Sequence, residues 1–201
     1  MRDFAVRQRW ALRVDTIDPP TLLNEIKPEL ALKRLVPTWR KCAEIARQAG
    51  VLLVWEFEPG FAFNKPSDVV RLVDEVGHPN FKVLFDTSHA HICAVVGARQ
   101  PGPKETLKGG VIEMIQMLKG KIGHIHLIDS DGTLHNDETS THAPFGKGLL
   151  DFDAIMPVLN QSGCSSPWWA IDLCFWPGSW EVTPACKQFM DKLNEKYGEA
   201  A

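Results

Sequence analysis

The sequence lacks several features that would assign it to a class of protein at once. No apolar run approaches the roughly 20 residues that a membrane-spanning helix needs, and the first residues contain no apolar region typical of a secretory signal. Lysine and arginine (22) do not outnumber aspartate and glutamate (25), so no positive charge excess favours nucleic acid or an anionic membrane. We therefore expect a cytoplasmic protein that binds neither nucleic acid nor a membrane.

The cysteines do not form the pattern of a disulfide framework. They are odd in number, widely scattered, and include no Cys-x-x-Cys pair. Reduced thiols, as in most cytoplasmic proteins, are the expectation. The five positions are Cys42, Cys93, Cys164, Cys174 and Cys186.

What the sequence does contain is a regular alternation of two patterns. Four short, nearly continuous apolar runs have the length and composition of strands that are buried on both faces of a parallel sheet: residues 51–56, 81–86, 122–129 and 168–173. Apolar residues at helical spacing precede, separate and follow these runs, over residues 39–49, 66–76, 111–118, 151–159 and 181–197.

Strands that alternate with helices across short connections predict βα units and an α/β fold. At 201 residues and 44% hydrophobic content, the chain is long enough for one buried core, so we expect a single domain over residues 1–201.

Acids and histidines stand near the C-terminal end of every predicted strand. In a parallel α/β barrel these ends converge on one face, where the active site is built. The residues are Glu56 and Glu58, Asp86 and His89, His124, His126 and Asp129, and Asp172.

Each of these positions also has a purely structural interpretation. Asp86 is equally suited to cap a helix or close a turn, and Glu56 and Asp172 could simply reach solvent at a strand end. His124 and His126 alternate onto one face of a strand, which favours a metal or substrate role over packing. Four such sites on four successive strands together indicate a functional centre.

The segment 129–148 is the most polar part of the chain and has the character of a loop that covers a substrate. His91, His135 and His142 are predicted to lie in loops and are individually weak indications of function. The tryptophans near the last predicted strand are expected mostly to fill core space.

Four motifs together resemble the sugar phosphate isomerase/epimerase family, whose members have the xylose isomerase-like (β/α)₈ TIM barrel. The resemblance runs from about residue 37 to the end of the chain. The motifs are VWEFEPG at residues 54–60, FDTSH at 85–89, HIHLID at 124–129 and PFGKGLLDF at 144–152.

The resemblance implies one divalent metal ion, such as Mn²⁺, Co²⁺, Mg²⁺ or Zn²⁺, bound at the ends of barrel strands five to eight. Carried onto this sequence, the ligands are Glu56, Asp86, His126 and Asp172. The resemblance also places Glu56, Asp172 and His89 in catalytic roles. The expected substrate-binding residues are His89, His124 and Glu58.

Two departures from the family pattern stand out. The family has glutamate on strand eight where this chain has Asp172, which shortens the reach of the carboxylate by about 1.5 Å. Only about 50 residues precede the strand that would be number five, so the first strands of a barrel of about 250 residues are missing. Either the sequence is truncated or a partner, such as a second copy in a homo-oligomer, closes the barrel.

The leading hypothesis is an isomerase or epimerase that removes a proton next to the carbonyl of a small sugar, keto-sugar or polyol. A lyase of the inosose dehydratase type would use the same metal site. An endonuclease IV-like hydrolase shares the barrel, but the net charge of −3 disfavours a DNA-binding groove. A catalytically inactive barrel fragment is the remaining alternative.

Overall fold

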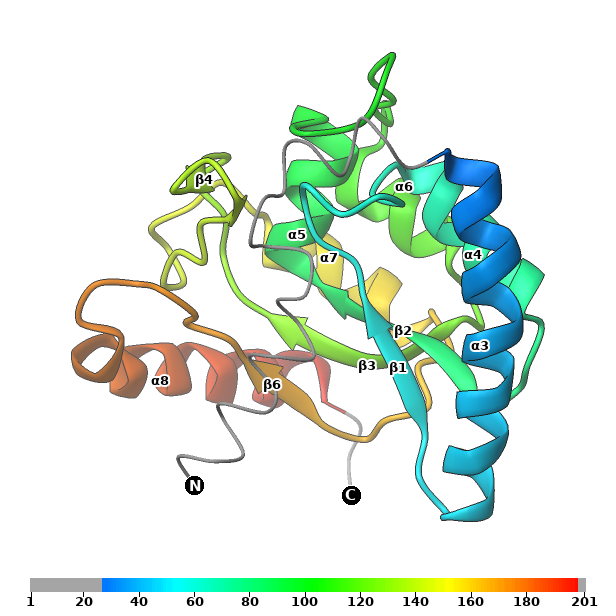
Figure 1. Cartoon of the computed structure of the whole chain (residues 1–201). Coiled ribbons are helices and arrows are strands. Elements are labelled where there is room, and N and C mark those ends of the chain that lie inside the picture. The colour runs from blue at the N-terminus through cyan, green and yellow to red at the C-terminus, as the bar shows by residue number, and fades with distance from the viewer. Residues whose placement is uncertain (1–26, 199–201) are drawn as a thin grey trace. The chain divides into compact units, whose positions relative to one another are not determined.

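The computed structural model describes residues 27–198 (Figure 1). The chain divides into two compact units, residues 1–35 and 36–201. Helix α3 (Pro28–Gln48) runs across this division, and the features described next belong to the second unit. The segment before residue 27 lies outside the described residues.

The centre of the second unit is a four-stranded parallel sheet in the order β1-β2-β3-β6. Each strand pairs with the next one in the sheet, and the register places Asp86 opposite His126. This order follows directly from repeated βα units and agrees with the predicted α/β class. The strands are β1 (Leu53–Glu56), β2 (Phe81–Asp86), β3 (Ile122–Leu127) and β6 (Trp169–Ile171).

Helices follow the strands as the sequence predicts. Figure 1 shows α4, α6 and α7 together behind the sheet, and α8 runs beside β6. The boundaries of α4 have a local cause, since Pro66 suits the first helical turn and Gly77 ends the helix at a φ of +56°. The helices are α4 (Pro66–Val76), α6 (Gly110–Met117), α7 (Phe152–Asn160) and α8 (Ser179–Tyr197).

The hydrophobic core lies between the sheet and these helices. Val83 and Phe85 of β2 and Leu127 of β3 are fully buried, and they pack with apolar side chains of α4, α6 and α7. The prediction that every strand is buried on both faces is wrong for β1 and β6. The side chains of both strands are only half-buried, and Val51, which precedes β1, is 57% exposed. The reason is that, among residues 27–198, each of these two strands has a neighbouring strand on one side only.

Two further features differ from the predicted pattern. A helix α5 (Thr87–His91) and a π-helix η1 (Ile92–Val96) follow β2 without a break. The polar segment 129–148 contains a short hairpin of β4 (Leu134–His135) and β5 (Thr139–Ser140). Helix α7 contains Pro157 and ends at Asn160, one residue from the predicted end. Within residues 27–198, no helix is long and apolar enough to cross a membrane.

Candidate metal centre

Four residues from four neighbouring strands meet at the C-terminal edge of the sheet. Glu56 and Asp86 are the last residues of β1 and β2, His126 lies in β3, and Asp172 directly follows β6. Each offers one ligand atom, and all four atoms lie within 4.8 Å of one another. The parallel strands are therefore what brings residues 116 positions apart into one cluster, from Glu56 to Asp172.

The Nδ1 atom of His126 is at the centre of this cluster. It lies 3.2 Å from Glu56 Oε1, 3.5 Å from Asp172 Oδ2 and 3.8 Å from Asp86 Oδ2. Nδ1, Glu56 Oε1 and Asp86 Oδ2 are buried and have no hydrogen-bond partner. Buried polar atoms without partners are rare because they cost free energy. Three carboxylates and one imidazole in this arrangement fit a divalent cation.

Asp86 both caps a helix and faces the four-residue cluster, the two roles that the sequence suggested for it. Its Oδ1 atom accepts hydrogen bonds from the backbone N–H groups of Ser88 (2.8 Å) and His89 (2.9 Å) and so caps α5. Its Oδ2 atom remains free to face the cluster. Burial raises the pKa of the Asp86 carboxyl to about 6, although His142 and the bond from His89 oppose this.

Asp172 is held in place on both of its oxygens. Oδ1 accepts the backbone N–H of Cys174 at 3.0 Å, and Oδ2 faces the imidazoles of His126 and His142 at 3.5 Å each. Burial raises the pKa of Asp172, but the two imidazoles outweigh it and hold the pKa well below its usual range. Burial likewise lowers the pKa of His126, and the carboxylates of Asp172 and Glu56 outweigh it to raise that pKa to about 10.

His89 points into the site from α5. Its Nδ1 atom bonds Ser140 Oγ, which leaves Nε2 directed toward Glu56 Oε1 at 3.9 Å. The side chain is almost fully buried, and burial together with the nearby His142 holds its pKa well below the usual value. The imidazole of His89 is therefore neutral near pH 7.

The two remaining predicted residues lie beside the four-residue cluster rather than in it. His124 bonds Ser166 Oγ through Nδ1 at 3.1 Å, and its ring meets that of His126 edge-on at 5.6 Å. Glu58 accepts a hydrogen bond from Thr139 of β5 at 2.9 Å. Burial raises the pKa of Glu58 to about 7.

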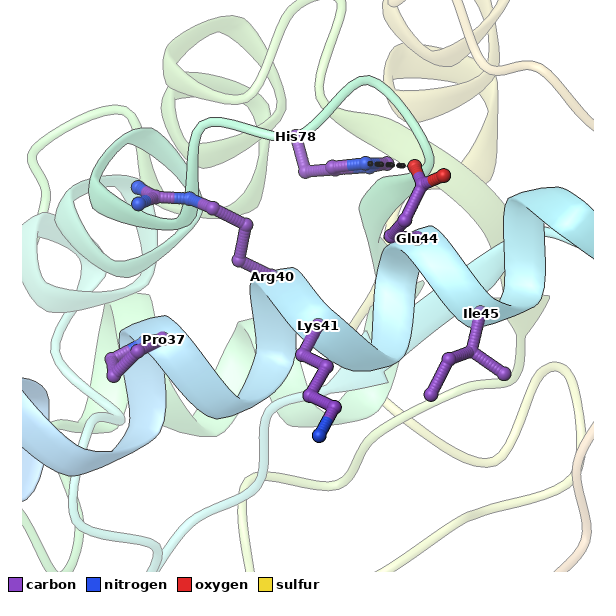
Figure 2. A pocket seen from close by; sticks show the side chains of 6 residues that line it. All are labelled: Pro37, Arg40, Lys41, Glu44, Ile45 and His78. Carbon is purple, nitrogen blue, oxygen red and sulfur yellow. Dashed lines mark hydrogen bonds and ion pairs between the residues drawn. The ribbon is translucent and has the colours of Figure 1, made fainter.

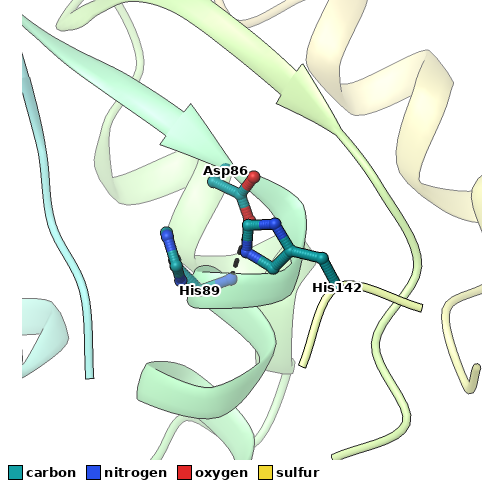
Figure 3. Close-up of side chains that lie close together, drawn as sticks. All are labelled: Asp86, His89 and His142. Carbon is teal, nitrogen blue, oxygen red and sulfur yellow. Dashed lines mark hydrogen bonds and ion pairs between the residues drawn. The ribbon is translucent and has the colours of Figure 1, made fainter. Parts of the chain in front are cut away.

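His142 lies at the candidate site, although the sequence contained only a weak indication of a function for it. It lies in the predicted loop, yet only 3% of it is exposed, and its ring is 4.9 Å from that of His89 (Figure 3). Its Nε2 atom lies 3.8 Å from Asp86 Oδ1. The only signal in the sequence was the crowding of six of the seven histidines between residues 89 and 142.

The segment that carries His142 is fastened by Asp129. The buried carboxylate of Asp129 accepts hydrogen bonds from four backbone N–H groups, and its backbone pairs with that of Ala143 in both directions. Segment 129–148, which was predicted to cover a substrate, is thus held by hydrogen bonds on both sides of His142. The four donors are the backbone N–H groups of Ser130, Gly146, Gly148 and Leu150.

A surface pocket on α3 contains none of the predicted site residues. In this pocket His78 lies 3.3 Å from Glu44 (Figure 2). The lining also includes Pro37, Arg40, Lys41 and Ile45.

Comparison with known proteins identifies the family of this chain. Residues 11–182 match the family described as xylose isomerase-like TIM barrel. The chain belongs to this family. The predicted fold, a xylose isomerase-like barrel represented by its later strands, is therefore confirmed.

One curated protein that is similar to this chain has a named activity. An inosose dehydratase from Erwinia tasmaniensis is 23% identical over 140 residues, which are 64% of this chain and 43% of that protein. The chain thus spans less than half of this relative.

Solved structures of similar fold are also longer than this chain. The IOLI protein with a bound zinc atom has a TM-score of 0.66 at 22% identity, covering 88% of this chain and 60% of that one. D-psicose 3-epimerase with D-tagatose, from Clostridium cellulolyticum H10, has a TM-score of 0.61 at 17% identity, covering 87% and 59%. At these identities the likeness establishes the fold.

Proposed function

We propose that Glu56, Asp86, His126 and Asp172 bind one divalent metal ion. We further propose that the protein is an isomerase or epimerase that acts on a small sugar, keto-sugar or polyol. The observation that carries this proposal is the cluster of four ligand atoms within 4.8 Å, three of them buried without a hydrogen-bond partner. The zinc named for the IOLI protein and the magnesium named for a Mycobacterium smegmatis family structure support a metal site at this fold.

When bound, such an ion would polarise a substrate carbonyl and the hydroxyl on the next carbon, and so acidify the hydrogen on the carbon that carries this hydroxyl. Mn²⁺, Co²⁺, Mg²⁺ and Zn²⁺ all accept oxygen and imidazole ligands. Glu56 and Asp172 approach the cluster from the two outer strands of the sheet. One carboxylate takes the proton from carbon, and the other returns a proton to the opposite face, which inverts that carbon.

The neighbouring side chains orient the substrate. His89 is neutral, and Ser140 fixes its ring so that Nε2 faces the site and bonds a substrate oxygen. His124 and Glu58 flank the cluster and are placed to bind further hydroxyl groups. Asp172 is held by the backbone N–H of Cys174 and faces two imidazoles, whereas Oε1 of Glu56 has no hydrogen-bond partner, so Glu56 is the better candidate for the first proton abstraction.

The similarity to an inosose dehydratase favours elimination as the second candidate. In that reaction the same proton leaves carbon, and a hydroxyl on the next carbon departs as water. The two reactions share the metal site and the first base, so they differ only in their products.

The test is carried out on the full chain loaded with Mn²⁺ in D₂O. D-fructose, D-tagatose and 2-keto-myo-inositol are incubated separately, and NMR records deuterium at the carbon next to the carbonyl. An epimeric ketose supports the lead proposal, and a dehydrated diketone supports the alternative. Glu56→Gln should slow exchange by about 10²–10⁴-fold, while His78→Gln, in the pocket on α3, should leave it unchanged. Absence of both bound Mn²⁺ and exchange would refute the proposal.

A further inference from the structure

One short strand holds two of the side chains that are proposed to bind substrate. Thr139 of β5 donates a hydrogen bond to Glu58 Oε2 at 2.9 Å. The next residue, Ser140, is 1% exposed, and its Oγ atom bonds His89 Nδ1. Figure 1 shows β4, the first strand of this hairpin, on the side of the sheet toward which the arrows point. The position of the β4–β5 hairpin therefore decides how Glu58 and His89 face the site.

Left-handed backbone conformations gather around this hairpin. Within residues 27–198, four residues other than glycine have a positive φ. Asn136 (+51°) and Asp137 (+57°) form the turn of the hairpin, a type I′ turn that requires a positive φ at both positions. Arg99 (+55°) and Phe175 (+63°) lie outside the hairpin, and a positive φ is unfavourable for such large side chains. Each of these two residues nevertheless contacts the hairpin.

Arg99, which lies in the loop after η1, contacts the hairpin at its turn. Its Nη1 atom donates a hydrogen bond to the backbone carbonyl oxygen of Asp137. The backbone carbonyl oxygen of Arg99 accepts a hydrogen bond from Nδ2 of the fully buried Asn64 at 3.2 Å. A Cβ atom at Gly60 would lie 2.8 Å from Arg99 Nε, so the guanidinium group lies against the loop after β1. Arg99 thus connects the turn of the hairpin to the loop that contains Glu58.

Phe175, which lies in the loop after β6, contacts the hairpin at β4. Its ring stacks on that of His135, with the centroids 5.0 Å and the planes 7° apart. Phe175 is 55% exposed, so burial in the core does not account for its unfavourable backbone conformation. It follows Asp172 by three residues. The stack thus connects the hairpin to the loop that carries a ligand of the four-residue cluster.

We infer that Arg99 and Phe175 are positioning residues that hold the β4–β5 hairpin against the site from two loops. The hairpin in turn orients the substrate-binding side chains of Glu58 and His89. Unfavourable backbone conformations persist only where the surrounding contacts impose them, and they cluster at functional sites. The inference rests on the proposed function for the role of Glu58 and His89, but the hold on the hairpin can be tested without metal or substrate.

The ring of His89 reports the position of the hairpin. A neutral imidazole carries its hydrogen on either Nδ1 or Nε2, and a fixed hydrogen bond at Nδ1 selects one of these tautomers. The full chain is labelled with ¹⁵N in histidine, freed of metal, and measured by NMR in mildly alkaline buffer. His89→Gln identifies the His89 signals, and Ser140→Ala provides the spectrum of a ring that is released from the hairpin.

We expect a single tautomer of His89 in the wild type and the released spectrum, a mixture of tautomers, in both Phe175→Ala and Arg99→Ala. Phe175→Tyr should keep the wild-type spectrum, because its ring can still stack on His135. The matched control is Trp180→Ala, which removes another exposed aromatic ring at the start of α8 and should also keep the wild-type spectrum.

Metal binding separates this inference from the proposed function. In Phe175→Ala the affinity for Mn²⁺, measured by calorimetry, should change by less than about threefold, because the four proposed ligands lie in the sheet or directly after it. A large loss of affinity in this variant would show that Phe175 acts on the metal ligands, and it would overturn the inference. A wild type that binds no Mn²⁺ would refute the proposed function and leave the NMR result intact.

Each NMR outcome decides the inference. Circular dichroism and thermal unfolding establish that each variant is folded, and Phe175→Leu and Arg99→Met carry the test if the alanine variants are not. Release in both folded variants, with a wild-type spectrum in Phe175→Tyr, supports the inference. A wild-type spectrum in both variants overturns it, and so does a mixture of tautomers in the wild type. Release in only one variant overturns the role of the other residue, and release in Phe175→Tyr overturns the role of the ring stack.

Discussion

The Oδ1 atom of Asp86 accepts the backbone N–H of His89 at 2.9 Å, while the Oδ2 atom of the same carboxyl group faces the four-residue cluster without a hydrogen-bond partner. One oxygen therefore serves the fold and the other is available to an ion. The two roles can be separated, because an amide keeps an acceptor oxygen and lacks the negative charge.

Asp86→Asn should keep the cap of α5 and lose metal binding. We expect its free energy of unfolding, measured with urea on metal-free protein, to stay within about 1 kcal/mol of wild type. Its affinity for Zn²⁺, measured by calorimetry, should fall by at least about tenfold. Asp86→Ala should lose the cap as well, at a further cost of about 1 kcal/mol. Wild-type zinc affinity in Asp86→Asn would contradict the assignment.

Asp129→Ala should destabilise the protein strongly, because it leaves four backbone N–H groups without their shared acceptor. We expect a loss of at least about 3 kcal/mol in urea unfolding. The matched control is Asp131→Ala in the same segment, whose carboxylate accepts from the exposed Thr133. That change should stay within about 1 kcal/mol. Equal losses in the two variants would show that Asp129 does not fasten the segment.

Two nearby glycines should respond differently to alanine. A Cβ atom at Gly148 would lie 2.5 Å from the carbonyl oxygen of Ser130, and it would also collide with the Asp129 carboxylate. We expect Gly148→Ala to cost about 3 kcal/mol or more. At Gly146 a Cβ atom meets nothing within 4 Å, and only its φ of +79° is unfavourable, so Gly146→Ala should cost about 1–2 kcal/mol. Urea unfolding of both variants measures the difference, and the reverse order would refute this packing.

The stability of the metal-free protein should fall as pH rises from 7 to 10. Burial lowers the pKa of His126, but the nearby carboxylates raise it overall to about 10, above the ordinary value of 6.5. The folded state therefore favours the protonated ring, which stabilises fully below pH 6.5 and no longer does so above about pH 10. Calorimetric unfolding across this range should show a smaller decline for His126→Gln. The pKa of His142 is raised too, so some decline should persist in the variant; an unchanged slope would count against His126.

The ends of helices were predictable where proline or glycine fixes the local backbone conformation. Pro66 and Gly77 set the ends of α4 through backbone conformation alone, and both ends fall where the sequence indicates. The exposure of β1 was not predictable in this way, because an apolar run does not reveal whether a strand has one neighbour or two.

The sequence by itself determined the βα alternation and the positions of Glu56, Asp86, His126 and Asp172 at successive strand ends. Parallel strands direct their C-terminal ends to one edge, so these residues had to meet once the sheet formed. The tertiary structure decided the place of His142. No periodic pattern locates a loop, and this one is positioned by the hydrogen bonds that Asp129 accepts from residues as distant as Leu150. Those long-range bonds exist only in the folded chain, and they turn a loop histidine into a buried neighbour of two carboxylates.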